Sequence, residues 1–419
     1  MNLKDKTVCV VDTGNWVPFA EKMAESFGTT YYYRPSSENG YMSLKDSMIG
    51  EGYDNVKCLD EEGFWDVVED VDLFCFTDCV FVGLQEHLKK LGKLVWGSGK
   101  TAWMEQDRFA LRDWQRKEGM PTPEYKTITG IKNLENIPPE TFIKVNNYVR
   151  GDVESAKHYD KERSKTRLYE FSTKLGGYAD KMKFMVENKI EGVEIGEDTW
   201  TIDGKFPRVI IHGVEIKDKG YYGEISLAEK LPRQIKYINE KMSKVFKEEK
   251  TRSFYSNEIR VDKKGDAYLT DQTMRLPLPP YQLHLEMWDN LAECIYAGTQ
   301  GILIEPKPIA KYGCVVMINS DFACDNWMSL KIPEENHRWI KLMNCCKIDG
   351  EDWVMPIYGF SEIGAVVGIG KTQQEAIDNC KKHCEGIKGD SIEIDVDCLD
   401  DAIEEFEKMN GDKLEGLTS

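Results

Sequence analysis

Two acidic residues, Glu258 and Asp271, are the side chains of this 419-residue chain best placed to do chemistry. Alternating runs on both sides of residues 263–266 (KKGD) predict a β-hairpin. A turn at Lys264-Gly265 places Glu258 directly opposite Asp271, and a four-residue turn gives the same register. Facing carboxylates repel each other by roughly 0.2–1 kcal/mol unless a cation lies between them. The register also pairs Asp262 with Ala267 and Arg260 with Leu269.

Thr273 and Arg275 follow Asp271 on the same strand face, because side chains alternate along a strand. A threonine offers a neutral oxygen, and an arginine offers a fork for phosphate oxygens. Mg²⁺ bound by one or two carboxylates together with nucleotide phosphates needs such a set. The hairpin therefore predicts a metal site formed by Glu258, Asp271 and Thr273. The same residues are explained equally well by a solvated hairpin without a metal ion, in which Arg260 or nearby lysines neutralise the acids.

Two cationic residues lie earlier in the chain. Lys144 ends the apolar run TFIKV, where it could reach nucleotide phosphates, although an ordinary edge-strand lysine explains it as well. Arg108 lies on a predicted helix, for which a solvated face is the ordinary explanation.

The segment from Val186 to Glu194 predicts a nucleotide contact. A strand that ends in Glu187, Asn188, Lys189 and Ile190 presents backbone N–H and C=O groups, which can pair with the edge of adenine. Glu194 could accept both ribose hydroxyls. A strand and turn decorated with acids is the alternative.

Composition excludes several classes of protein. The net charge of −18, from 73 acids against 55 bases, argues against general binding of nucleic acid or of anionic membranes. Twelve cysteines contain no CxxC pair, and the charged N-terminus runs straight into a predicted strand, so we expect a cytoplasmic protein with reduced thiols. No run of eighteen apolar residues exists.

The order of elements predicts an α/β and α+β multidomain protein. Strands expected near 7–11, 29–33, 71–76 and 93–96 alternate with helices and indicate an N-terminal parallel α/β domain over 1–98. A helix over 101–118 opens a second domain, expected over 99–300. Strands near 314–318, 353–358 and 365–370, with a helix at 372–388, indicate a small C-terminal α+β domain over 301–419.

In order, the chain shows a cation on a helix (Arg108), a strand lysine (Lys144), a strand followed by Gly-x-Glu (187–194), and acid-x-Thr-x-Arg (271–275). This order resembles the ATP-grasp superfamily, and most closely the phosphoribosylamine–glycine ligases. The resemblance covers most of the chain. It includes KLVWGSGKTAWMEQDRFALRDWQRKEGMPTPEY, TIDGKFPRVIIHGVEIKDKGYYG and GAVVGIGKTQQEAIDNCKKHCEGI.

The resemblance implies a pre-ATP-grasp domain and a two-lobed ATP-grasp domain with a lid over about 122–187. It also implies an ATP-dependent carboxylate–amine ligase that acts on small molecules through an acyl phosphate. It implies ATP and Mg²⁺ (or Mn²⁺) as cofactors. The implied catalytic residues are Arg275 and Lys144. The implied nucleotide contacts are Arg108, Lys144, Glu187, Asn188, Ile190 and Glu194, and the implied metal ligands are Glu258, Asp271 and Thr273.

The chain also departs from the family. Arg108 and Thr273 replace a lysine and an asparagine, and the segment NNYVRGDVESAK, with Gly151 alone, replaces a glycine-rich lid. Asp12 to Trp16 replace a glycine-rich turn that binds a sugar phosphate. We therefore expect the reaction type but not the substrate to carry over. The alternatives are phosphoryl transfer or carboxylation on the same scaffold, and a catalytically silent nucleotide-binding or scaffold protein.

Overall fold

The computed structural model describes residues 2–35, 48–138, 141–145, 157–158, 169, 172–173, 176–216, 219–357 and 360–410. Residues 146–156, most of the glycine-poor segment expected to form the lid, lie outside these residues.

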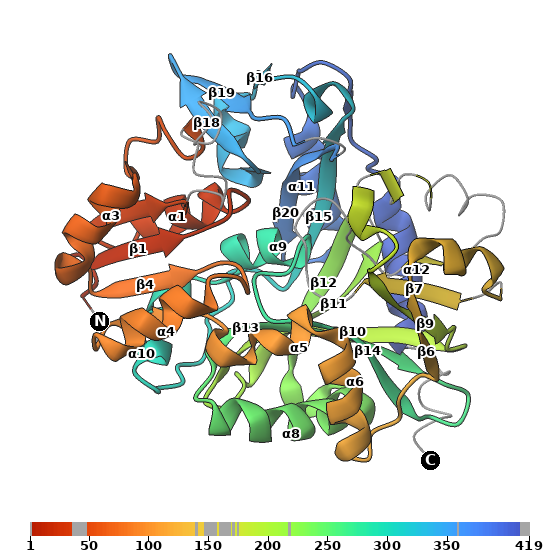
Figure 1. Cartoon of the computed structure of the whole chain (residues 1–419). Helices are drawn as coiled ribbons and strands as arrows, with labels where there is room; N and C mark the ends of the chain where they lie inside the picture. Colours follow the sequence, from red (N-terminus) through yellow and green to blue (C-terminus); the bar gives the residue numbers. More distant parts are fainter. Residues whose placement is uncertain are drawn as a thin grey trace.

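The N-terminal part of the chain forms a parallel sheet, in which β1 and β4 lie side by side (Figure 1). Its five strands follow the order β3-β2-β1-β4-β5. Along β1, Val8 and Val10 pack into one core, whereas Cys9 and Val11 pack into another. A strand covered on both faces is apolar throughout, which explains the run TVCVV. The predicted parallel α/β layer is confirmed. Its elements are β1 (Thr7–Val11), α1 (Val17–Ala24), β2 (Thr29–Tyr33), β3 (Lys57–Leu59), α3 (Glu61–Val67), β4 (Leu73–Phe76), α4 (Val82–Lys90) and β5 (Leu94–Trp96).

A long antiparallel sheet follows the path β14-β13-β10-β11-β12-β15-β20-β17 through the middle of the molecule. The expected domain boundary at 300/301 lies between α10 and β15, and β15 then pairs with β12, so the sheet continues across that point. The strands are β10 (Val193–Ile202), β11 (Val209–Ile216), β12 (Gly220–Leu227), β13 (Arg252–Val261), β14 (Ala267–Thr273), β15 (Tyr312–Ser320), β17 (Ile340–Leu342) and β20 (Glu362–Gly370). The helices around it are α8 (Arg233–Glu248), α9 (Pro280–Met287), α10 (Leu291–Thr299), α11 (Gln373–Cys384) and α12 (Cys398–Asn410).

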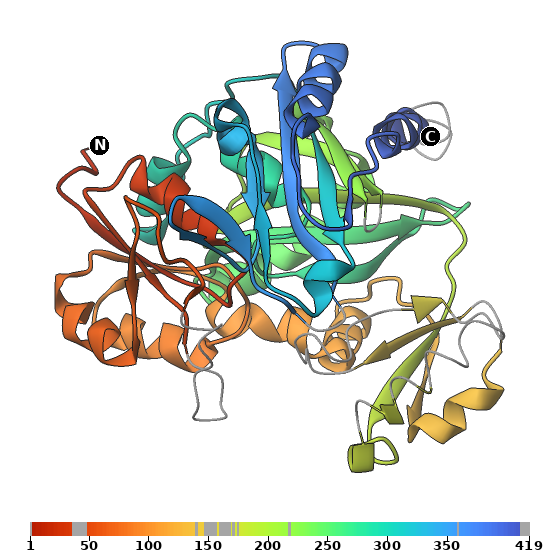
Figure 2. The same ribbon diagram turned by 90° about the horizontal axis from the view of Figure 1, so that it is seen from above.

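A four-stranded sheet in the order β6-β9-β7-β8 projects from the body of the molecule (Figure 2). It has its own core, in which Phe184 and Leu134 are fully buried. Its strands are β6 (Tyr125–Thr129), β7 (Thr141–Val145), β8 (Lys157–His158) and β9 (Lys183–Asn188). A further small sheet contains β16 (Met328–Leu330), β19 (Glu351–Val354) and β18 (Cys345–Ile348).

The single helix expected over 101–118 is wrong. The chain forms a short α5 (Trp103–Gln106) and then α6 (Arg108–Lys117), with a break at Asp107. Asp107 adopts a non-helical backbone (φ −118°, ψ 88°), and its carboxylate accepts a hydrogen bond from the Ala110 amide at 3.0 Å. It is an N-cap, which is the preferred position of aspartate. Among the described residues, none of the helices has both the length and the apolar character needed to cross a bilayer.

Candidate active site

The hairpin between β13 and β14 forms, with pairs near its turn that differ from the predicted ones. Val261 pairs with Ala267 in place of Asp262, and Arg260 pairs with Tyr268 in place of Leu269. Asp262 leaves the ladder because its carboxylate accepts hydrogen bonds from the amides of Lys264 and Asp266, at 2.8 and 3.0 Å. Aspartate commonly closes turns in this way.

A β-bulge between Glu258 and Ile259 shifts the register back by one residue. Glu258 therefore lies directly opposite Asp271, as predicted, and Thr273 lies opposite Ser256 on the same strands. A bulge beside a functional site commonly re-aims side chains. The two acids consequently share one face of the sheet.

Asp271 is partly buried, and a guanidinium lies beside it. The Arg108 Nη2 atom is 3.5 Å from the Asp271 Oδ2 atom, and the Gln272 amide donates to Oδ1 at 3.0 Å. Burial favours the neutral carboxyl, but the charges of Arg108 and Lys144, with the Gln272 amide, hold the pKa of Asp271 at about 2. Asp271 is therefore an anion at neutral pH. The neutralising cation is Arg108 rather than Arg260, which instead pairs with Glu194.

Lys144 and Glu187 meet at the junction of the small sheet and the hairpin. The Lys144 amino group is 3.2 Å from the Glu187 carboxylate and donates to the Thr270 carbonyl at 2.6 Å. Arg112 contacts the other Glu187 oxygen at 2.5 Å and donates to the Thr270 carbonyl at 2.7 Å. Burial favours the neutral form of Glu187, but the adjacent Lys144 and Arg112 outweigh it and lower its pKa. The Glu187 side chain thus holds two cations in place.

Two residues that contact the predicted site residues, Arg112 and Glu105, were not identified from the sequence. Arg112 lies one helical turn after Arg108, a spacing that could have shown both on one face of α6. Glu105 accepts hydrogen bonds from the Met274 amide at 2.7 Å and from Arg275 Nε at 2.8 Å. Because Glu105 is distant from Arg275 in the sequence, no local pattern indicated this pair.

The remaining predicted nucleotide contacts lie at the end of β9 and the start of β10. The Asn188 amide donates to the Glu124 carbonyl at 3.0 Å, so this N–H is already used. Ile190 lies in the connection that follows. Glu194 is half-exposed, and its carboxylate lies 2.6 Å from the Arg260 guanidinium. Glu194 and Glu258 share a sheet face, because Glu258 pairs with Gly196, two residues after Glu194.

The loop after β1 is filled by its own carboxylate. Asp12 is fully buried, and its Oδ2 atom accepts hydrogen bonds from the amides of Gly14 and Trp16, at 2.9 and 2.8 Å, and from the Tyr32 hydroxyl at 2.6 Å. The other oxygen accepts from Thr77 at 2.7 Å. Backbone amides that could receive an anion are thus already occupied by Asp12.

The oxygen atoms of Glu258, Asp271 and Thr273 determine which metal ion could bind on this face of the hairpin. In the described part of the chain, no three His, Cys, Asp or Glu side chains form a group that could hold a metal ion. Two carboxylates and a hydroxyl do not make a cage for a free ion, but Mg²⁺ ordinarily takes one or two carboxylates and completes its shell with phosphates and water. Glu258, Asp271 and Thr273 therefore fit an ion that arrives with a nucleotide.

Comparison with known proteins gives the same architecture. No family model and no curated protein matches this sequence. Phosphoribosylamine–glycine ligase from Thermotoga maritima is similar in structure, with a TM-score of 0.67 at 15% identity, over 93% of this chain and 98% of that one. L-amino acid ligase from Bacillus licheniformis has a TM-score of 0.60 at 15% identity, over 93% and 98% of the two chains. The biotin carboxylase domain of the Hydrogenobacter thermophilus 2-oxoglutarate carboxylase, solved with MgADP, has a TM-score of 0.63 at 13% identity, over 97% and 95%. These are ATP-grasp proteins, and the chain described here has the ATP-grasp fold.

Proposed function

We propose that this protein is an ATP-dependent carboxylate–amine ligase that forms a C–N bond and releases ADP. One observation carries the proposal: Glu258 and Asp271 lie opposite each other, with Arg108 and Lys144 beside Asp271. Two opposed carboxylates with cations beside them can bind a complex of a metal ion and a triphosphate. A catalytically silent protein would gain nothing from the repulsion between Glu258 and Asp271. The ligases and carboxylases of similar structure support the same reaction class.

In this proposal each residue has a role in positioning charge. MgATP, when bound, supplies the phosphoryl group that activates the acid. Asp271, Glu258 and Thr273 would hold the metal ion (Mg²⁺ or Mn²⁺), while Arg108 and Lys144 would bind phosphate oxygens. Because phosphoryl transfer needs little covalent help from the protein, such positioning supplies most of the catalysis.

Arg275 would steady the transferring group, held at the correct angle by Glu105. The Glu187–Ile190 segment would receive adenine, and Glu194 the ribose once its pair with Arg260 opens. A substrate carboxylate oxygen would attack the terminal phosphorus and expel ADP. An amine would then attack the acyl carbon, expel phosphate and lose a proton.

The substrate amine in this proposal carries no phosphate. The backbone amides of Gly14 and Trp16 already bind the Asp12 carboxylate, so a sugar phosphate would have to displace a buried anion there. Displacing a buried, fully hydrogen-bonded carboxylate is costly. An amino acid or another small unphosphorylated amine is therefore the substrate class that we propose.

We also propose that the enzyme is cytoplasmic, because its twelve cysteines are all free thiols.

Hydroxylamine trapping tests the proposal. The protein is incubated with MgATP, hydroxylamine and pooled carboxylic acids, and both ADP and hydroxamate are measured. We expect both products only when an acid is present. ADP that depends on bicarbonate, without hydroxamate, would favour the carboxylase alternative. Nucleotide binding without turnover over all acid pools would overturn the ligase in favour of the silent alternative.

A further inference from the structure

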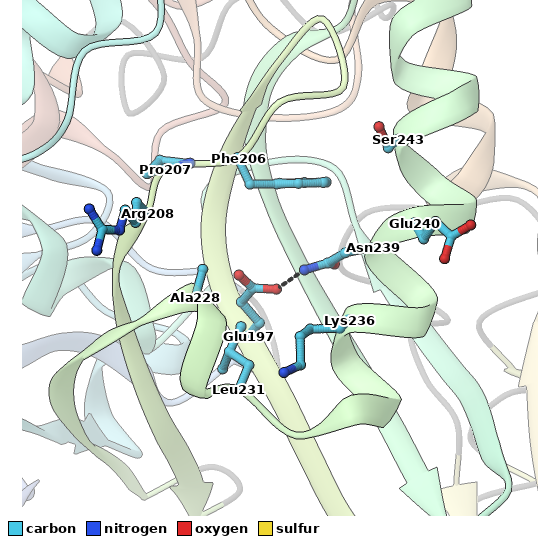
Figure 3. Close-up of a pocket in the computed structure, with 10 residues that line it drawn as sticks. All are labelled: Glu197, Phe206, Pro207, Arg208, Ala228, Leu231, Lys236, Asn239, Glu240 and Ser243. Atoms are coloured by element: carbon cyan, nitrogen blue, oxygen red, sulfur yellow. Dashed lines mark hydrogen bonds between the residues drawn. The ribbon is translucent and has the colours of Figure 1, made fainter.

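A pocket of about 400 Å³ lies between α8 and the central sheet (Figure 3). By the register of β10 and β13, it lies on the sheet face opposite to that of Glu258 and Asp271. Side chains alternate along β10, so Gly196 faces the candidate active site and Glu197 faces α8. One wall of the pocket is apolar and consists of Phe206, Pro207, Ala228 and Leu231. The pocket therefore belongs to neither the nucleotide face nor the loop after β1.

Glu197 is the group in this pocket without an evident structural role. Its side chain points into the pocket, and the residue is 1% exposed (Figure 3). The Oε2 atom accepts a hydrogen bond from Asn239 Nδ2 at 2.5 Å. The Oε1 atom is buried and has no hydrogen-bond partner among the described residues. A buried acceptor left without a donor costs about 1–3 kcal/mol, which a structural role does not explain.

Side chains on the two neighbouring strands also have buried oxygen atoms without hydrogen-bond donors. Asn257 on β13 lies opposite Glu197, and Gln272 on β14 lies opposite Asn257, so the three side chains form a row across the sheet. Within the described part of the chain, Asn257 Oδ1 and Gln272 Oε1 also have no hydrogen-bond donor. The amide N–H groups of Asn257 and Gln272 donate instead to the Tyr255 hydroxyl and to backbone carbonyls, so this row offers Glu197 no donor. A ligand suited to Glu197 brings N–H groups or positive charge.

The cations at the rim of the pocket are already used. Arg208 pairs with Glu229 at 3.0 Å, and the Lys236 amino group donates to the Glu229 carbonyl at 3.1 Å. Asn239 is held in turn by the Tyr255 hydroxyl, which donates to its Oδ1 atom at 2.7 Å. This bond orients the Asn239 amide toward Glu197, so the carboxylate position is preorganised.

We propose that this pocket is a second ligand site, which binds a small organic amine. The ammonium group of the ligand donates to Glu197 Oε1, and its apolar body packs on Phe206, Pro207 and Leu231. Burial raises the pKa of Glu197 to about 7, against the Asn239 hydrogen bond that lowers it, so above neutral pH the carboxylate is available as an anion. A charge-assisted hydrogen bond of this kind is stronger than one between neutral groups.

Phenethylamine and 2-phenylethanol are the probes, since they share an aromatic body and differ in the ammonium group. At pH 8, calorimetry with the full chain is expected to show saturable binding of phenethylamine with Kd on the order of 1 mM, and a roughly tenfold weaker signal for the alcohol. Glu197→Gln should lose this preference. Glu248→Gln, an exposed acid on the same helix that does not line the pocket, is the charge-matched control and should bind as the parent does.

A second variant keeps the test decisive if Glu197→Gln does not fold. Ala228→Trp fills the apolar wall and leaves the carboxylate in place, so it should abolish binding while Glu197 stays intact. Equal binding of amine and alcohol would overturn the proposal. So would no saturable binding of either probe, or an amine affinity unchanged in both variants. Saturation by KCl or MgCl₂ at the same site would also overturn it, in favour of an inorganic cation.

Discussion

At the scale of single residues, charge at Asp271 is the property on which the candidate active site depends. Arg108 and Lys144 keep this carboxyl ionised in spite of burial, so it is an anion at any pH near neutrality. Replacing the carboxylate by an amide preserves the shape of the side chain and removes its charge. The pair with Arg108 is also lost, but that pair is long, at 3.5 Å.

If Asp271 holds the metal ion as proposed, Asp271→Asn is expected to lower the rate of ADP release by roughly a hundredfold or more, because the ion beside the terminal phosphates would lose a carboxylate ligand. Circular dichroism and thermal melting should show an intact fold. Asp266→Asn, an exposed acid at the tip of the same hairpin, is the control and should keep the parent rate. An Asp271→Asn protein with undiminished turnover would refute the metal assignment.

Glu197 makes a prediction about stability and pH. Burial raises its pKa in the folded state to about 7, from an ordinary value of 4.5. The folded protein therefore binds more protons than the unfolded chain between about pH 4.5 and 7. The stabilisation is complete below this window and is lost as the pH rises through it, by up to about 3 kcal/mol.

Urea denaturation at pH 5 and at pH 8 measures this effect. Glu197→Gln has no proton to exchange, so its free energy of unfolding should fall less between the two pH values than that of the parent. Identical pH slopes for the two proteins would show that Glu197 is not the buried acid responsible.

At the scale of elements, α6 joins the small sheet to the hairpin through one side chain. Arg112 extends from α6 to Glu187 on β9 and to the carbonyls of Leu269 and Thr270 on β14. It is 1% exposed. Removing one partner of a buried ion pair leaves an uncompensated charge, at a cost of about 3–5 kcal/mol.

Arg112→Met should consequently destabilise the protein by several kcal/mol. The double variant Arg112→Met/Glu187→Gln should be destabilised by about 1–3 kcal/mol less than the sum of the two single variants, because the Glu187 carboxylate that Arg112 neutralised is then gone. Lys117→Met, at an exposed position of the same helix, should change stability by no more than about 0.5 kcal/mol. Strict additivity in the double-mutant cycle would mean that the pair is not coupled.

What the sequence predicts at this scale depends on how local the signal is. The parallel strands are confirmed because apolar runs and helices alternate over short distances. The meeting of Glu258 with Asp271 was predictable because a turn relates them, although the bulge at Ile259 and the Asp262 turn that correct the register were not. Arg112 with Glu187 and Glu105 with Arg275 join residues far apart in the chain. Only the tertiary fold brings such pairs together.

At the scale of the whole molecule, the small sheet has a core separate from that of the body. Ile131, Leu134, Ile143 and Phe184 pack with one another inside it. The body has cores of its own, and Phe246 on α8 belongs to one of them. A small core joined to the rest of a protein by polar bridges can lose stability independently, as a unit that opens locally.

Phe184→Ala should therefore unfold the small sheet while the body stays folded. The side chain is fully buried, and its truncation costs about 3–5 kcal/mol, a large fraction of what a small core supplies. Hydrogen exchange should show protection lost over 125–129, 141–145 and 183–188 and retained in β13 and β15. Nucleotide binding should fail, since Lys144 and Glu187 lie on that sheet.

Phe246→Ala, also fully buried, is the matched control and should lower protection in the body instead. A uniform loss of protection over both regions in Phe184→Ala would show that the molecule unfolds as one cooperative unit, and that the small sheet has no stability of its own.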